Sequence, residues 1–363
     1  MSACRRLSFA CVAAVATVIA QPLAARAQGP DPPEDPPAQA SMGTTPFTIQ
    51  GFGDIDYVSS TVDGFGGFKT GSLDLFVTSR LGNHWSALAE LVFEADENKL
   101  SADLERFEFT YEHSDALRVS VGRVHNPLLR WPVLNHHGLF NQTPIDSPII
   151  ARWEDEPGLW PTHFVGVLAQ GRFRNAAGLS YALGVGNGRG TALRTVQVTS
   201  DANSQRAVLV SAGVAPDFLS GLEVSASAYF DRIPAESGSL RERDGTLSGS
   251  FVRGDAELRG EVSWMRHHDL TTRITNQTMG WYVLGAHRLP ARLARLTPYG
   301  LVEELKAADG EAFFEGIPDE VARTVGLRWD ATRWVALKGD YRWQKVAGTD
   351  WFGAVRAQLA VNF

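Results

Sequence analysis

The sequence predicts an all-β fold, a sixteen-stranded antiparallel transmembrane β-barrel with one long loop folded inward. Three observations predict it. Apolar and polar residues alternate with a period of two from Pro46 onward, short and long connections alternate along the chain, and the strands are long enough to cross a bilayer at a tilt. Because successive side chains of a strand point to opposite faces, each strand has one apolar and one polar face.

The N-terminal segment has the pattern of an export signal. Two arginines precede the apolar run 7–20, and ARAQ at 25–28 supplies a small-residue cleavage site, so we expect residues 1–27 to be a secretory signal peptide. The run is shorter than the roughly 20 residues of a membrane-spanning helix, which disfavours an uncleaved anchor. Both cysteines, Cys4 and Cys11, lie inside the signal. The mature chain therefore has neither a disulfide nor a thiolate metal site.

The segment 28–45 is rich in proline and acidic residues, a composition that forms no packed core. We expect a disordered or polyproline linker there, followed by the barrel at 46–363. Without the three arginines of the signal peptide, the chain has 31 basic residues against 41 acidic ones, a net charge of −10. This acidic balance argues against nucleic acid as a partner.

Alternation is clearest in FTIQGFGDIDY at 47–57, ERFEFTYE at 105–112, AELRGEVSW at 256–264 and VALKGDYRWQ at 335–344. The polar face of the strands carries too many charges for a dry core, so we expect this face to line a water-filled lumen. The same pattern predicts strands at 46–57, 70–80, 84–95, 103–113, 117–124, 162–173, 178–187, 205–214, 221–231, 245–253, 256–265, 277–288, 294–305, 320–330, 333–344 and 350–363.

Connections and strand lengths favour a membrane barrel over a soluble β-sandwich or propeller. Short turns such as RLGNH and HSDA alternate with longer connections at 58–69, 188–204, 232–244 and 306–319. Strands of about 9–11 residues suit a tilted bilayer crossing, whereas strands of globular proteins average about 5–6. No repeat of blade length is present. Tryptophans gather near strand ends, as in interfacial girdles: Trp85, Trp264, Trp281, Trp329, Trp334, Trp343 and Trp351.

One connection, 125–161, is far longer than the others. It contains six prolines and is unusually apolar. Long loops without secondary structure in compact domains are usually functional, and an apolar loop in water would expose a hydrophobic patch. We therefore expect this loop, the third of the long connections, to lie against other parts of the protein.

The stretch GRVHNPLLRW…HHG…QTPIDSPII…WEDEPG resembles the corresponding part of phosphate-selective and related porin-like channels, and 46–363 as a whole resembles the sixteen-stranded general porins of Gram-negative outer membranes. The resemblance implies that loop 125–161 folds into the barrel and narrows the pore, and that the barrels associate as a homotrimer. It identifies no solute. Phosphate selectivity is not expected, because acidic residues outnumber basic ones in the loop and the chain has only five lysines.

Charged side chains of the loop and the wall are the candidate site residues, because rings of charge set ion preference in pores. Arginine suits such a ring, since its guanidinium group pairs with carboxylates in a planar fork. The alternative for each residue is a solvated lumen side chain or an anchor for the loop. The loop candidates are Arg130, His136, His137, Asp146, Arg152, Glu154 and Asp155, and the wall candidates are Arg106, Glu108, Arg118, Arg259, Glu261, Lys338, Asp340, Arg342 and Arg356.

Other kinds of site are less well supported. His136 and His137 suggest a metal site, but neighbours on an extended segment point in opposite directions, and no H-x-H or H-E-x-x-H spacing is present. We expect no metal and no other cofactor. A G-x-S-x-G motif is also absent. Two alternatives to a channel stay open: an outer-membrane enzyme that hydrolyses lipid or peptide, and a surface-binding barrel without conduction.

The last strand, WFGAVRAQLAVNF, is expected to close the barrel by pairing with the first strand, which removes an exposed sheet edge. Arg356, Gln358 and Asn362 are then expected to face the lumen. The terminal Phe363 resembles the signal that outer-membrane assembly machinery reads. The sequence as a whole predicts a porin through which small hydrophilic solutes or ions diffuse passively. Its expected partners are these solutes, outer-membrane lipids, lipopolysaccharide and the barrel assembly machinery.

Overall fold

The computed structural model describes residues 46–62, 66–96, 99–135, 139–152, 158–173, 177–190, 201, 204–235, 238–308, 310 and 317–363. All structural statements below concern these residues. The predicted signal peptide, 1–27, and the whole of the predicted linker, 28–45, lie outside them. Four candidate site residues also lie outside the described residues: His136, His137, Glu154 and Asp155.

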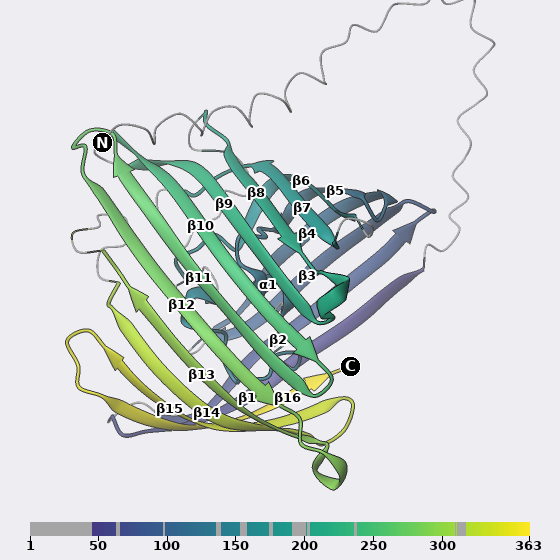
Figure 1. Ribbon diagram of the computed structural model, residues 1–363, viewed down its shortest axis with the longest axis vertical. Helices are drawn as coiled ribbons and strands as arrows, with labels where there is room; N and C mark the ends of the chain where they lie inside the picture. Colours follow the sequence, from purple (N-terminus) through teal and green to yellow (C-terminus); the bar gives the residue numbers. More distant parts are fainter. Residues whose placement is uncertain are drawn as a thin grey trace, which may run out of the picture. The chain divides into compact units, whose positions relative to one another are not determined.

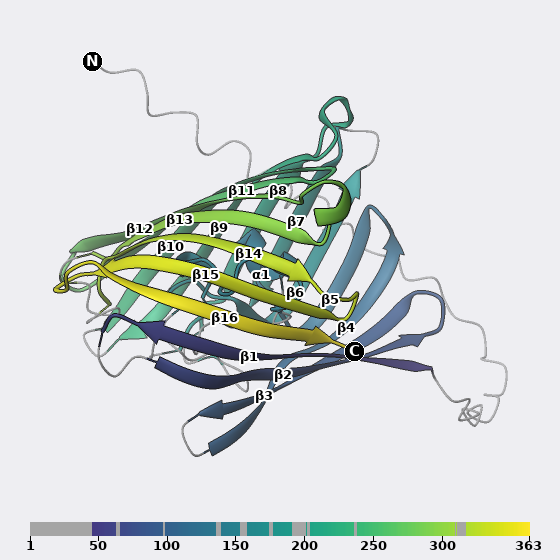
Figure 2. The same cartoon turned by 90° about the horizontal axis from the view of Figure 1, so that it is seen from below.

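Sixteen strands among the described residues form one closed barrel, in which each strand pairs antiparallel with both neighbours in sequence order (Figures 1 and 2). The predicted fold class is confirmed, and each strand overlaps one predicted segment. The strands are β1 (Phe47–Ser60), β2 (Gly66–Leu81), β3 (Trp85–Asp96), β4 (Lys99–Ser114), β5 (Leu117–His125), β6 (His163–Phe173), β7 (Leu179–Gly186), β8 (Ala207–Val214), β9 (Leu222–Ala235), β10 (Gly238–Arg253), β11 (Ala256–Asp269), β12 (Thr275–His287), β13 (Leu296–Lys306), β14 (Glu320–Asp330), β15 (Val335–Val346) and β16 (Phe352–Asn362).

The two faces of the strands differ as the period of two predicts. On β1, Ile49 and Ile55 are exposed whereas Asp54 is buried, and on β15 Leu337 is exposed whereas Lys338 is buried. Exposed large apolar side chains recur in this way on all the strands. A belt of this kind is far larger than the apolar patches of soluble monomers, so the outer face of the barrel is suited to contact with lipid.

Two connections that the sequence predicts to be long, 58–69 and 232–244, are mostly strand. β1 continues to Ser60 before β2 begins at Gly66, and β9 and β10 are separated only by 236–237. The backbone ladder continues there, but charged residues occupy both faces of the second hairpin, so its sequence lacks the alternation that marks a strand. Besides the third loop, the longer connections are 187–206 and 307–319.

The C-terminus closes the barrel, as predicted. β16 pairs with β1, and beyond the paired register Gly51 and Phe363 exchange two backbone hydrogen bonds of 2.8 and 2.9 Å. The ring of Phe363 lies over Gly51, where an added Cβ would be only 2.4 Å from the ring. A glycine is therefore required at this contact. Arg356 and Gln358 are buried inside the barrel, which confirms the predicted inner face of β16.

The third loop lies inside the barrel and forms much of its apolar core. It contains a short helix, α1 (Arg130–Leu134), and a 3₁₀ turn, η1 (Ile149–Ala151); Figure 2 shows α1 within the ring of strands. No helix among the described residues is long and apolar enough to cross a membrane. Buried loop side chains pack with inward apolar side chains of β6–β14: the loop contributes Leu128, Leu129, Trp131, Ile149, Ile150, Leu159 and Trp160, and the wall contributes Phe164, Leu209, Tyr229, Met265, Tyr282, Leu301 and Leu305.

Candidate pore constriction

The start of α1 is held by a carboxylate from the barrel wall. Glu261 of β11 accepts hydrogen bonds from the backbone N–H of Arg130, at 2.7 Å, and of Trp131, at 2.8 Å. Tyr282 donates its hydroxyl to the same carboxylate at 2.9 Å. No side chain of α1's own N-cap residue bonds to these N–H groups, which a helix leaves without an intrahelical partner. Glu261 therefore supplies the missing cap from across the lumen.

The 3₁₀ turn η1 is held in a similar way further along the loop. Ile149 donates its backbone N–H to Glu303 of β13 at 2.6 Å, and the other carboxylate oxygen of Glu303 accepts from Arg342 at 2.5 Å. Ile150 lies against Gly280 of β12, where an added Cβ would be 2.3 Å from the Ile150 side chain. Any larger residue at position 280 would push the loop away from the wall.

Two loop side chains form ion pairs with the wall. Arg152 donates two hydrogen bonds of 2.8 Å to the two oxygens of Glu320, a bidentate pair that fixes the orientation of both groups. Asp146 pairs with Arg356, which also donates two bonds of 2.8 Å to the buried Asp340. Although desolvation raises the pKa of Asp146, Arg356, Arg342 and Arg152 outweigh it and hold that pKa below its ordinary value. The Asp146 carboxylate is thus charged and locally balanced.

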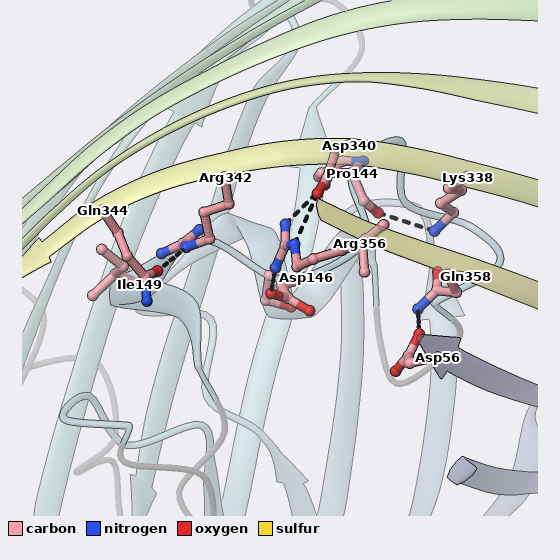
Figure 3. Close-up of polar contacts among 12 residues, drawn as sticks. Asp56, Pro144, Asp146, Ile149, Lys338, Asp340, Arg342, Gln344, Arg356 and Gln358 are labelled. Atoms are coloured by element: carbon pink, nitrogen blue, oxygen red, sulfur yellow. Dashed lines mark hydrogen bonds and ion pairs between the residues drawn. The ribbon is translucent and has the colours of Figure 1, made fainter. Parts of the chain in front are cut away.

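Basic wall side chains also bind the loop backbone. Lys338 donates to the carbonyls of Leu139 and Pro144, and Arg328 donates to the carbonyls of Phe140 and Gln142 at 2.6 and 2.8 Å. Figure 3 shows three basic side chains of β15 and β16 directed toward the loop: Lys338, Arg342 and Arg356. Carbonyls in a loop without regular structure have no ladder partner, so these cations satisfy groups that would otherwise be buried unpaired.

The structure brings together eight of the candidate residues: Arg130, Asp146, Arg152, Glu261, Lys338, Asp340, Arg342 and Arg356. Six of them form contacts between loop and wall and anchor the loop, the alternative that the sequence left open. Asp340 and Arg342 instead bond to wall residues, Arg356 and Glu303, that contact the loop themselves. The influence of these eight residues on passing ions stays a prediction.

The remaining wall candidates lie apart from this cluster. Arg106 pairs with Glu90 at 2.8 Å and Arg259 with Glu257 at 2.6 Å, both within the wall. Glu108 is partly buried on β4. Arg118 lines a polar cavity of about 730 Å³ between the loop segment 127–133 and the β4–β9 wall. This cavity shows that the loop leaves space beside it.

Sequence reasoning missed several residues that hold the loop, chiefly Glu303, Glu320 and Arg328. On β13 the inner face also carries buried Leu301 and Leu305, because the loop packs there. The alternation of that strand is therefore weak, and Glu303 does not stand out. Glu303 lies two residues from each of these leucines and therefore shares their inward face, and this position was the sequence signal that could have identified it.

The wall formed by β1–β3 carries acidic side chains that the candidate set also omits. Asp54 accepts the backbone N–H of Ser72 at 3.3 Å, and Asp56 accepts the amide of Gln358 at 3.0 Å. Asp74 is buried on the neighbouring strand. Among the described residues none of these three aspartates forms an ion pair, and of the three only Asp56 is not buried.

No arrangement of three or more His, Cys, Asp or Glu side chains in the described part of the chain fits a metal ion. The carboxylates of the site are instead bound to arginines and to backbone N–H groups. The site thus consists of a fixed loop, paired charges and polar space, an arrangement that can restrict passage.

Comparison with known proteins supports the fold. No family model matches the chain, and no curated protein matches it in sequence. Among solved structures, the chain is similar to the anion-selective porin from Comamonas acidovorans (TM-score 0.64, 16% identity, 88% of this chain and 100% of that one). It is also similar to OmpF of Salmonella typhi in complex with daunomycin, with a TM-score of 0.63 and 13% identity, over 88% of this chain and 98% of that one. A third similar structure is the outer membrane channel DcaP of Acinetobacter baumannii, with a TM-score of 0.62 and 12% identity, over 87% of this chain and 97% of that one.

Proposed function

We propose that this protein is an outer-membrane porin, through which small hydrophilic solutes or ions diffuse passively past the third loop. The observation that carries the proposal is the loop itself, which is fixed across the interior of a closed barrel by hydrogen bonds to β11, β13, β14, β15 and β16. A polar cavity of about 730 Å³ remains beside it.

The distribution of side chains supports conduction. The outer face is apolar and the inner face carries charged groups, and charges of this number remain favourable only where water or a partner solvates them. A barrel of sixteen strands is wide enough to hold an aqueous channel. Because the loop is anchored at both α1 and η1, we expect a permanently narrowed pore that does not open by loop release.

The location and assembly follow from the same proposal. An exported barrel with a lipid-facing belt belongs in the outer membrane, with lipids and lipopolysaccharide around it. The terminal Phe363 is proposed as the residue that the assembly machinery recognises. Association of outer walls as a homotrimer is proposed by analogy, since the chain is similar in fold to a trimeric form of OmpT from Vibrio cholerae (TM-score 0.60, 10% identity, 88% of this chain and 99% of that one).

Planar-bilayer recording of the purified, folded protein tests the channel. We expect stepwise current increases of uniform size, and the reversal potential under a salt gradient measures the preference for cations or anions. Absence of steps from protein whose strand content is intact would contradict the porin and favour a hydrolytic enzyme or a surface-binding barrel. Assays of lipid and peptide hydrolysis on the same preparation would then separate those two.

A further inference from the structure

The short turns that follow β10, β12 and β14 lie side by side at the end of the barrel opposite the long connections. Arg288 donates its backbone N–H to the carbonyl of Asp255 at 2.8 Å, and Asp330 donates its backbone N–H to the carbonyl of Arg295 at 2.9 Å. These bonds join the three turns into one rim. Two cavities of about 390 and 330 Å³ lie between this rim and the third loop, and we call them the arginine cavity and the hydroxyl cavity.

The arginine cavity, the larger of the two, carries an excess of positive charge. Its charged lining residues are four arginines and one aspartate: Arg288, Arg295, Arg328, Arg333 and Asp330. The carboxylate of Asp330 is shared, because it pairs with Arg328 at 2.8 Å and with Arg288 at 3.7 Å. One carboxylate against four guanidinium groups leaves three positive charges uncompensated. The cavity is therefore suited to an anion.

Two of these arginines keep donors for a ligand. Arg295 donates to the carbonyl of Ala331 at 2.9 Å, and the guanidinium group of Arg333 lies 4.5 Å from the ring centre of Trp334. Neither arginine forms an ion pair with a described residue. A guanidinium group has five N–H donors, and its planar fork matches the two oxygens of a carboxylate.

The hydroxyl cavity adjoins the arginine cavity and has a different lining. The two cavities share three residues: Arg288, Arg328 and Asp330. The other polar residues that line the hydroxyl cavity carry amide, hydroxyl or carboxylate groups: Asn141, Thr143, Asp255, Glu257 and Thr297. Glu257 bonds to Arg259 at 2.6 Å, whereas Asp255 forms no ion pair with a described residue. Groups of these kinds donate to and accept from the hydroxyl groups of a ligand.

The cavity of about 730 Å³ beside α1 shows that the excess of positive charge is particular to the rim. It is lined by three arginines and four acidic residues: Arg118, Arg130, Arg172, Glu112, Asp115, Asp217 and Glu223. Its charges nearly balance, and Arg130 and Arg172 both lie near Glu223, at 2.8 and 3.8 Å. The two sides of the third loop therefore offer different surroundings to a solute.

We propose that the arginine cavity and the hydroxyl cavity together bind a small hydroxylated carboxylic acid, such as a sugar acid. Its carboxylate would meet Arg295 and Arg333, and its hydroxyl groups would meet Asp255 and the neighbouring polar side chains. The proposal rests on the proposed channel and names its solute, because the cavities lie on the short-turn side of the third loop, which faces the periplasm in barrels of this kind.

Simpler ligands fit the two cavities less well. A neutral sugar would leave the positive charge of the arginine cavity uncompensated. A carboxylate without hydroxyl groups would leave Asp255 and its neighbours without a partner. Because a permeating solute must also leave its site, the binding is expected to be weak.

Binding can be measured by ligand-observed NMR titration of the full mature chain, folded in a neutral detergent. The probe is gluconate, and its matched comparators are sorbitol, which lacks the carboxylate, and propionate, which lacks the hydroxyl groups. We expect gluconate to bind about threefold more tightly than either comparator, or better, since each lost set of hydrogen bonds costs at least that factor.

Three variants assign the two cavities. R333Q should weaken gluconate and propionate alike, by about tenfold, as expected for one charge-assisted hydrogen bond. D255N should weaken gluconate by about threefold and leave propionate unchanged. The control R292Q replaces an exposed arginine of the same turn as Arg295 that lines neither cavity, and it should bind all probes like the unmodified protein. Folding of R333Q is expected to be intact, because its side chain contacts only the Trp334 ring among the described residues.

The outcomes of the titration separate the parts of the proposal. Equal gluconate affinity in R333Q and R292Q would overturn the site. Propionate that binds as tightly as gluconate would overturn the hydroxylated class, and sorbitol that binds as tightly would overturn the role of the arginines.

Channel recordings keep this proposal separate from the porin itself. Gluconate added to one side at a time should reduce the current of the unmodified protein and of R292Q more from one side than from the other, because the cavities lie on one side of the constriction. R333Q should lose most of this difference. Normal channels without gluconate binding would overturn the site and leave the porin standing. If none of the proteins forms channels, the porin proposal fails while the titration still decides whether the cavities bind the acid.

Discussion

The inner wall of the barrel has two regions that use the same kinds of side chain differently. On β11–β16, inward charges bind the third loop: Glu261 and Glu303 accept its N–H groups, and Arg356 pairs with Asp146. On β1–β3, Asp54 and Asp56 bond to neutral groups of the wall and form no ion pair with a described residue. We call these regions the loop-bearing wall and the acidic wall.

The difference teaches that an inward charge in a barrel has no fixed role. Where it meets the loop it stabilises the fold, because its removal leaves a buried partner unpaired. Where it is partly exposed and does not touch the loop, as at Asp56, it can act on ions at a distance and contributes little to the docking of the loop. Substitutions in the two regions should therefore change different measured quantities.

The largest effect is expected for R356M in the loop-bearing wall. The change leaves Asp340 buried without its cation and Asp146 without its partner, and breaking a buried pair costs about 3–5 kcal/mol. Urea unfolding in detergent, followed by tryptophan fluorescence, measures the free energy of unfolding. The control R253M replaces an exposed arginine and should stay within about 0.5 kcal/mol of the unmodified protein. Equal midpoints for the two variants would mean that Arg356 does not anchor the loop.

A smaller loss is expected for E303Q. The amide keeps an acceptor for Ile149 but removes the charge that Arg342 binds at 2.5 Å. We expect a destabilisation of about 1–3 kcal/mol and greater current noise in single-channel records, because η1 is held less firmly. E304Q, the adjacent outward-facing residue, is the control and should leave the current noise unchanged. If E303Q conducts as quietly as E304Q, the loop does not depend on this anchor.

Substitutions in the acidic wall should change the ion preference of the channel and not the stability of the protein. For the variant D56N, which removes a partly exposed carboxyl group of this wall, we expect the ratio of cation to anion permeability to fall on the order of twofold, since a unit charge about 8 Å away in water acts with about 0.5 kcal/mol. Reversal potentials under a potassium chloride gradient measure the ratio. An unchanged reversal potential would mean that ions do not pass along this wall.

The smallest effect concerns pH and Asp146. Its pKa in the folded protein is held below the ordinary value of 3.8, so its contribution to loop docking is present above that value and is lost as the pH falls through the lower, folded pKa. The change in conductance that depends on the Asp146–Arg356 contact should therefore appear only in acid below the ordinary carboxyl range. D146N should lack this acid transition. A transition at the same pH in D146N would assign it to another group.

The sequence predicted the barrel well and the partners of the loop poorly, for physical reasons. Lipid favours apolar residues at outward positions, so enough alternation remains in each strand to locate it, although it fails in the hairpin of β9 and β10 and is weak in β13. The loop was located by its length, prolines and apolar residues. The contacts of the loop were not predictable. The alternation along a strand shows which face a side chain occupies, but it does not show which residue of a distant segment lies against that side chain. Glu303 and Glu320 illustrate this limit.

The anchors of the loop also constrain the order of folding. Asp146 and Arg356 are 210 positions apart, and Arg130 and Glu261 are 131 apart. The loop leaves the chain after the fifth strand, yet its partners lie on strands that are synthesised much later. Contacts of such long range form slowly, because the intervening chain must be ordered first. The docking of the loop is therefore a late step, together with the still longer-range closure of β1 on β16, and a barrel that closes before its loop is inside would have to admit the loop through an open end.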